Sequence, residues 1–189
     1  MGDQHPLIGL RVLEVGSRTI TPYIGKLFTD AGADVLKVES PEGDPFRTWS
    51  ASHATIPDGE DSAWWRFLNA GKRIATIDLE TPEGHEAFLE LVDETDLVLD
   101  DHKPEDTERL NITPEELRAH NPAAVIASLT HFGTSGPWAN RPANDFTLQA
   151  LVGATENRGI PGEEPTACGG DLGDFVAAAL SAPAVLAVT

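Results

Sequence analysis

Short apolar runs alternate with a helical pattern along the first 40 residues. Residues 11–15 form one apolar run and residues 33–39 form a second, and both are typical of buried strands. Between them, residues 22–31 are typical of a helix, because Pro22 suits its first turn and Gly32 suits the position just past its end. The pattern predicts a strand–helix–strand unit with parallel strands.

The same alternation resumes after an interruption. Residues 41–65 are rich in proline and glycine and predict a long irregular loop. Thr81-Pro82-Glu83 is typical of a helix start, for a helix that runs to Glu94, and Thr113 with Glu116 predicts a complete capping box at the start of a short helix. The expected strands are residues 11–15, 34–39, 73–79, 96–100 and 124–129.

Repeated strand–helix–strand units with buried strands are typical of an α/β fold with right-handed crossovers. The sequence therefore predicts a Rossmann-like, mainly parallel sheet with flanking helices, in a single domain over residues 1–189. Residues 175–189 are almost all small or apolar, which predicts a helix buried on every side. We therefore expect either that the chain is the front part of a larger domain or that this helix packs against another chain.

Composition and charge narrow the classes of function. The 189 residues include 31 acidic and 13 basic side chains, a net charge of −18, which disfavours nucleic acids and anionic membranes as partners. No apolar stretch approaches the ~20 residues that span a bilayer, and the first residues lack a signal pattern, so we expect a cytoplasmic protein. One cysteine excludes a disulfide framework, and six scattered histidines predict no metal site.

Common nucleotide-binding and hydrolase motifs are missing from the sequence. The turn after the first apolar run contains Gly16 but no Gly-x-Gly-x-x-Gly cradle, although Glu39 closes the second run where an acid would bind a ribose. There is neither a P-loop nor a Gly-x-Ser-x-Gly elbow. Cys168 has no histidine near it in sequence to act as a base, so we interpret it as a small buried residue.

Two carboxylates mark the start of the terminal helix. Asp171 and Asp174 are three residues apart and are flanked by glycines, which would let a bulky ligand approach the backbone. The free N–H groups and the dipole of a helix N-terminus would keep an aspartate ionised and ready as a nucleophile. The alternative is that Asp174 simply caps the helix, and this segment by itself favours the cap.

Fragments spread along the chain share their order and spacing with a known family. They are residues 10–15, 32–41, 43–47, 69–73, 78–84, 109–110, 121–122, 132–137, 144–145 and 173–174. Each fragment is weak by itself, but the ordered set resembles the class III CoA-transferases, or CaiB/BaiF family, which include formyl-CoA transferase and related acyl-CoA racemases. The resemblance implies the N-terminal part of that family's large domain.

The resemblance also implies an activity, the transfer of CoA between an acyl-CoA thioester and a carboxylic acid. In that family an aspartate attacks the thioester to give a mixed anhydride, CoA thiolate then forms an aspartyl-CoA thioester, and the acceptor acid completes the exchange. The family's Leu-Gly-Asp turn matches Leu172-Gly173-Asp174, which makes Asp174 the expected catalytic residue. Asp171 is the alternative, because Ala178 stands where the family usually has a glycine.

Expected contacts with CoA follow from the same resemblance. CoA is a substrate in this family, and no permanently bound cofactor is expected. Thr19 lies in the loop over the acyl site, where relatives often have a glutamine. Lys72 and Arg73 are expected near the CoA phosphates, and Arg109 beside the adenine and phosphates. The other expected contacts are Ser17, Arg18, His131 and Phe132.

The resemblance leaves two alternatives and a question of assembly. The racemase branch has a His-Asp pair where this chain has Asn144-Asp145, so one of the two bases for proton shuttling is missing and racemization is the second choice. A non-catalytic CoA-binding remnant that needs a partner chain is the other alternative. The expected partners are an acyl-CoA, a small carboxylic acid, and either a second copy or another CoA-transferase chain.

Overall fold

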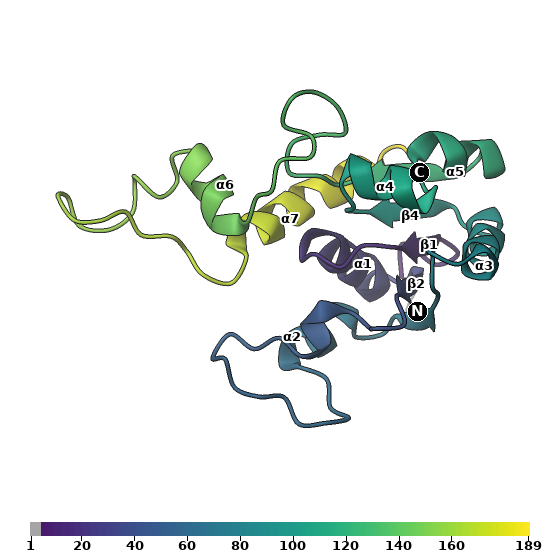
Figure 1. Ribbon diagram of the computed structural model, residues 1–189, viewed down its shortest axis with the longest axis horizontal. Helices are drawn as coiled ribbons and strands as arrows, with labels where there is room; N and C mark the ends of the chain where they lie inside the picture. The colour runs from purple at the N-terminus through teal and green to yellow at the C-terminus, as the bar shows by residue number, and fades with distance from the viewer. Residues whose placement is uncertain (1–4) are drawn as a thin grey trace.

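The computed structural model describes residues 5–189 and contains a sheet of parallel strands (Figure 1). The strands pair in the order β3-β2-β1-β4-β5, and every neighbouring pair is parallel. The predicted α/β fold with a mainly parallel sheet is confirmed. Within the described residues the strands are β1 (Arg11–Glu14), β2 (Asp34–Glu39), β3 (Arg73–Thr76), β4 (Leu97–Asp100) and β5 (Val125–Ser128).

Helices connect the strands, and those with clear start signals were predicted correctly. Thr81 and Thr113 are N-caps as expected, and Thr113 and Glu116 make both bonds of the capping box. The first helix begins at Ile20, two residues earlier than the pattern predicts. The helices in the described part are η1 (Pro45–Arg47), α1 (Ile20–Asp30), α2 (Ala63–Asn69), α3 (Pro82–Asp93), α4 (Pro104–Leu110), α5 (Pro114–His120), α6 (Asp145–Leu151) and α7 (Leu172–Leu186).

The sheet is covered by helices on both faces. Helices α1 and α7 pack against one face in a core that includes Val12, Phe28 and Ala178. Helices α3, α4 and α5 cover the other face in a core that includes Leu13 and Phe88. Val12 and Leu13 enter opposite cores because successive side chains of a strand point to opposite faces. Segments around α2 and α6 extend away from the sheet (Figure 1).

Two sequence predictions need correction. The expected loop over residues 41–65 contains η1 and the start of α2, and the pattern also missed α4 and α6. Strand β3 ends at Thr76 rather than at residue 79, because its partner β2 ends opposite Thr76 at Glu39. Within residues 5–189 helix α7 is covered on one side only, since Leu180 is 73% exposed although Ala178 is buried, so its packing against more of the domain or another chain stays a prediction.

The strand order determines where a ligand can bind. It reverses between β1 and β4, and at such a switch point the loops that follow the two strands separate and leave a crevice at their carboxyl ends. Residues 15–19 follow β1 and residues 101–103 follow β4, so both loops lie at this crevice. Of the helices in the described residues, none is long and apolar enough to cross a membrane.

Candidate active site

The loop that follows β1 is held by the buried carboxylate of Asp101, just after β4. Asp101 accepts hydrogen bonds from the backbone N–H groups of Ser17, at 3.2 Å, and Arg18, at 3.1 Å. Gly16 permits this approach, because a Cβ there would lie 2.5 Å from the Asp101 carboxyl group. Burial raises the pKa of Asp101, and the nearby positive charge of Arg18 opposes that shift only in part.

The Arg18 side chain joins the β1 loop to the loop after β5. Its Nη2 donates to the carbonyl of Leu129 at 2.6 Å, and its Nη1 lies 2.9 Å from each ring nitrogen of His131. Arginine can only donate, so this contact requires an unprotonated nitrogen on the His131 ring. The two loops therefore bring a permanent positive charge and an imidazole together at the crevice.

Both candidate aspartates at the start of α7 reach this group of residues. Asp171 is the N-cap, in a left-handed conformation with φ 51°, and its Oδ2 accepts from the Thr19 hydroxyl at 2.7 Å. Asp174 lies in the first helical turn, is 8% exposed, and its Oδ1 is 3.6 Å from Nε2 of His131. Asp174 is thus not the cap, and its carboxylate faces the His131 imidazole.

The start of α7 is fixed from α6 by Asp145. The Asp145 carboxylate accepts the backbone N–H of Gly173 at 2.7 Å and the side-chain amide of Gln149 at 2.5 Å. A Cβ at Gly173 would collide with Asp145, so the glycine allows the close approach. Asn144 caps α6 through Thr147. Both residues of the Asn144-Asp145 pair therefore make bonds that hold the two helices.

An aromatic row continues from the residue after Asp174. The Phe175 ring packs against Tyr23, with centroids 4.5 Å apart, and against Trp64 at 5.4 Å. Trp64 in turn contacts Trp49 at 5.2 Å. These rings come from α1, α2, α7 and the segment before α2, and they form an aromatic wall that begins at Phe175, the residue after Asp174.

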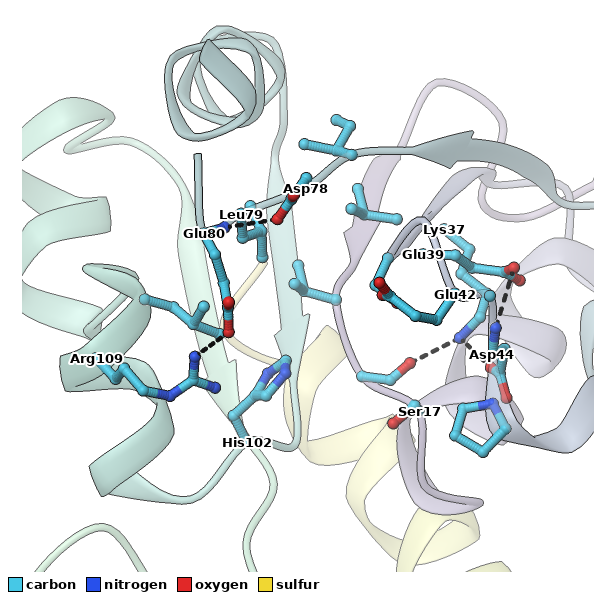
Figure 2. Close-up of a pocket in the computed structure, with 18 residues that line it drawn as sticks. Ser17, Lys37, Glu39, Glu42, Asp44, Asp78, Leu79, Glu80, His102 and Arg109 are labelled. Carbon is cyan, nitrogen blue, oxygen red and sulfur yellow. Dashed lines mark hydrogen bonds and ion pairs between the residues drawn. The ribbon is translucent and has the colours of Figure 1, made fainter. Parts of the chain in front are cut away.

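A cleft of about 550 Å³ opens beside Ser17 along the carboxyl ends of β1, β2 and β3 (Figure 2). Arg109 and Glu80 lie on one side of it and form an ion pair, while Glu39 and Asp44 lie on the other side. Residues 15–17 of the loop after β1 line this cleft, and Arg18 and Thr19 follow them in the same loop. The remaining lining residues with ionisable side chains are Lys37, Glu42, Asp78 and His102.

Comparison with known proteins identifies the family. The model of CoA-transferase family III matches residues 7–189. The chain belongs to CoA-transferase family III. The succinate–glutarate CoA-transferase of Agrobacterium fabrum is 35% identical over 185 residues, covering 96% of this chain and 46% of the relative. The succinyl-CoA–D-citramalate CoA-transferase of Chloroflexus aurantiacus is 36% identical over 179 residues, covering 94% and 44%.

A solved structure of the same family agrees with the fold. A CaiB/BaiF family protein from Brucella suis is 36% identical and superposes with a TM-score of 0.91, over 98% of this chain and 49% of that protein. The recognition of the CaiB/BaiF family from ordered sequence fragments is thereby confirmed. The chain spans about half the length of the family III relatives that it matches.

The Lys72 side chain points into the protein interior and does not line the cleft. Its ammonium is fully buried and donates to Glu14 at 2.7 Å, to the carbonyl of Pro22 at 2.8 Å and to Asn69 at 3.1 Å. Burial lowers the pKa of Lys72 to about 8 in spite of the Glu14 charge. Lys37 lies beside it, donating to Glu14 at 3.1 Å and to the Gly16 carbonyl at 2.6 Å. Lys72 therefore takes part in a buried ion cluster.

The other expected residues divide between the crevice and the rest of the molecule. Arg73 pairs with Asp34 at 2.8 Å at the amino ends of β3 and β2, opposite to the carboxyl ends where the crevice lies. Phe132 is half-buried and its ring is 5.5 Å from that of Trp138. Cys168 is half-buried, and its backbone bonds to Gln149. The structure brings together Ser17, Arg18, Thr19, His131, Asp171 and Asp174.

The sequence interpretation missed Asp101 and the structural role of Asp145. Asp101 has no signal of its own, because its contacts join residues more than 80 positions apart. Asp145 was named in the Asn144-Asp145 pair, and its place at the start of α6 could have been found, since Asn144 and Thr147 have the spacing of a capping box. The tryptophans at 49 and 64 lie in a segment that proline and glycine made look irregular.

Proposed function

We propose that this chain supplies the aspartate and the acyl-binding loop of a CoA-transferase, which moves CoA between an acyl-CoA and a carboxylic acid. The observation that supports this most is the position of Asp174. Its carboxylate is nearly buried in the first turn of a 15-residue helix, where the helix dipole favours the ionised form. His131 lies beside it at a switch-point crevice, and Arg18 contacts the His131 ring.

The proposed reaction has four steps at one carboxylate. An Asp174 oxygen attacks the thioester carbonyl, and CoA thiolate leaves as a mixed anhydride forms. The thiolate attacks the aspartyl carbonyl of that anhydride, which releases the first acid and leaves an aspartyl-CoA thioester. The acceptor carboxylate attacks this thioester, and CoA thiolate leaves again as a second mixed anhydride forms. The thiolate then attacks the new acyl carbonyl, which gives the new acyl-CoA and restores Asp174.

In this proposal the acyl group and the nucleotide end of acyl-CoA bind in separate places. The acyl group lies against Asp174 and the aromatic wall of Phe175 and Trp64, which excludes water from the anhydride. The nucleotide end lies in the cleft beside Ser17, where Arg109 exchanges Glu80 for a phosphate. A second copy or another family III chain covers the exposed side of α7, where Val176 and Leu180 are at the surface.

Racemization gains no support from the geometry. Asn144 cannot act as a base, and Asp145 is engaged by Gly173 and Gln149. CoA transfer is also consistent with the names of the two relatives, both of which are CoA-transferases for dicarboxylic acids. We therefore propose a dicarboxylic acyl group for this chain.

Paired variants test the nucleophile, each assayed in the complete assembly, which is this chain together with the second copy or other family III chain that covers α7. Asp174→Asn removes the attacking oxygen but keeps the side-chain shape, so we expect exchange between succinyl-CoA and free acids to fall by about 10⁴-fold or more. Asp171→Asn is the matched control, because asparagine tolerates the left-handed backbone and can still accept from Thr19. We expect its activity to fall less than about tenfold. Near-normal turnover in Asp174→Asn would refute the assignment.

A further inference from the structure

Arg18, which contacts the candidate nucleophile's neighbour His131, has hydrogen-bond donors that its internal contacts do not use. A guanidinium carries five N–H donors. Arg18 uses Nη2 on the Leu129 carbonyl and Nη1 on the His131 ring, which leaves one further N–H on each of these two nitrogens. Its Nε is buried and has no hydrogen-bond partner among the described residues.

The charge of Arg18 is also incompletely paired. Its nearest carboxylate is Asp101, but the closest approach, from Nε to Oδ1, is 3.8 Å, longer than a hydrogen bond. The Asp101 oxygens instead accept the backbone N–H groups of Ser17 and Arg18. Asp101 therefore holds the loop while the outer edge of the guanidinium stays available, and the Arg18 side chain is 30% exposed.

The distance to Asp174 limits what this arginine can bind. Two successive contacts, 2.9 Å from Arg18 to His131 and 3.6 Å from His131 to Asp174, join the guanidinium to the candidate nucleophile. A group that touches both must be short, with roughly two or three carbon atoms between the reacting carbonyl and a second carboxylate, as in succinyl or glutaryl. The net charge of −18 adds a reason for a cation here, because a second carboxylate beside Asp174 would otherwise be repelled.

We propose that Arg18 binds the distal carboxylate of a short dicarboxylic acyl group, such as succinyl, while Asp174 attacks the thioester carbonyl at the other end. This inference rests on the proposed function and assigns its acyl specificity to one residue. The two free terminal N–H groups form a bidentate pair with the carboxylate, which a lysine ammonium cannot reproduce. The neutral analogue, butyryl-CoA, leaves the guanidinium without a partner in a site that has lost water.

The test compares two thioesters of equal chain length. In the complete assembly we expect kcat/KM to be about 100-fold or more higher for succinyl-CoA than for butyryl-CoA. Arg18→Met should lower the ratio of kcat/KM for succinyl-CoA to that for butyryl-CoA from about 100 to near one. Arg18→Lys should show a kcat/KM for succinyl-CoA between those of the wild type and Arg18→Met, since lysine keeps the charge without the bidentate geometry. Arg11→Met, at the amino end of β1, is the control and should change kcat/KM for neither thioester.

The outcomes separate this inference from the function on which it rests. Equal loss with both thioesters in Arg18→Met, while its thermal unfolding stays normal, would show that Arg18 serves CoA or the loop and would overturn the inference alone. A wild-type protein that uses butyryl-CoA as well as succinyl-CoA would overturn it too. Absence of exchange with every thioester, and of any adduct on Asp174, would instead overturn the proposed function.

Discussion

Lys72→Met tests whether the Lys72 ammonium stabilises the fold or binds a ligand. The ammonium has no exposed surface and donates to Glu14, to the Pro22 carbonyl and to Asn69. Methionine keeps most of the side-chain volume but removes all three bonds. Glu14 then retains Lys37 as an ion-pair partner, 3.1 Å from its Oε1.

The size of the effect follows from this partial loss. Removing one partner of a buried ion pair costs ~3–5 kcal/mol. Because Lys37 still compensates Glu14, we expect the low end, a decrease of about 3 kcal/mol in the free energy of unfolding. For a chain of this length the melting temperature should fall by roughly 6–12 °C. Affinity for CoA should change by less than about threefold, because the ammonium does not reach the cleft.

Urea unfolding and calorimetric titration with CoA measure the two quantities. Lys103→Met is the matched control, since the Lys103 side chain is 41% exposed and its Nζ lies 3.9 Å from Glu105, and it should change stability by less than about 0.5 kcal/mol. Unchanged stability in Lys72→Met together with a tenfold or larger loss of CoA affinity would refute this reasoning. It would restore the interpretation of Lys72 as a phosphate ligand.

The pH dependence of the same variant adds a signed test. Burial lowers the pKa of Lys72 to about 8, below the value of 10.5 for an unperturbed lysine. Between these values the unfolded chain binds more protons at this residue, so its contribution to stability increases as pH rises. The contribution is complete above 10.5 and is lost as pH falls through about 8. Relative to wild type, Lys72→Met should lack this increase.

Two further substitutions test helices on opposite faces of the sheet, one for packing and one for capping. Gly25→Ala would usually strengthen a helix, but here the new Cβ collides with Glu14 and lies 3.1 Å from Nζ of Lys72. Urea unfolding should therefore show a loss of about 1–3 kcal/mol, and a gain in stability would contradict the structure. Thr113→Ala removes the cap of α5 and should cost about 1 kcal/mol, and an unchanged unfolding midpoint would show that the capping box is unimportant.

The predictable and unpredictable parts of this structure differ in the range of their interactions. Strands β1, β2 and β4 were found because each is a local apolar run that is largely buried, whereas the edge strand β3 is mostly exposed. Helices α3 and α5 were found because threonine caps mark their starts. Helix α4 has seven mostly polar residues and no side-chain cap, so its local pattern is weak. The separation of 58 positions between Glu14 and Lys72 likewise hides their ion pair from local patterns.

The candidate site shows the same division. The Asp171–Asp174 segment was conspicuous in the sequence, because two acids among glycines precede an apolar helix. The choice of Asp174 as nucleophile came from the family resemblance and stays a prediction. Which side chains surround it depends on how the loops after β1 and β5 meet, and the structure brings Arg18 and His131 there, while Lys72 and Arg73 form ion pairs elsewhere.

Mass spectrometry of the covalent intermediate tests the central claim most directly. The complete assembly is mixed with succinyl-CoA, quenched in acid within one turnover, and digested, and the peptide that contains residues 171–174 is sequenced. A covalent aspartyl mechanism predicts a CoA or succinyl adduct on Asp174, absent from Asp174→Asn and present in Asp171→Asn. An adduct on Asp171 or Cys168, or rapid exchange without any adduct, would contradict it.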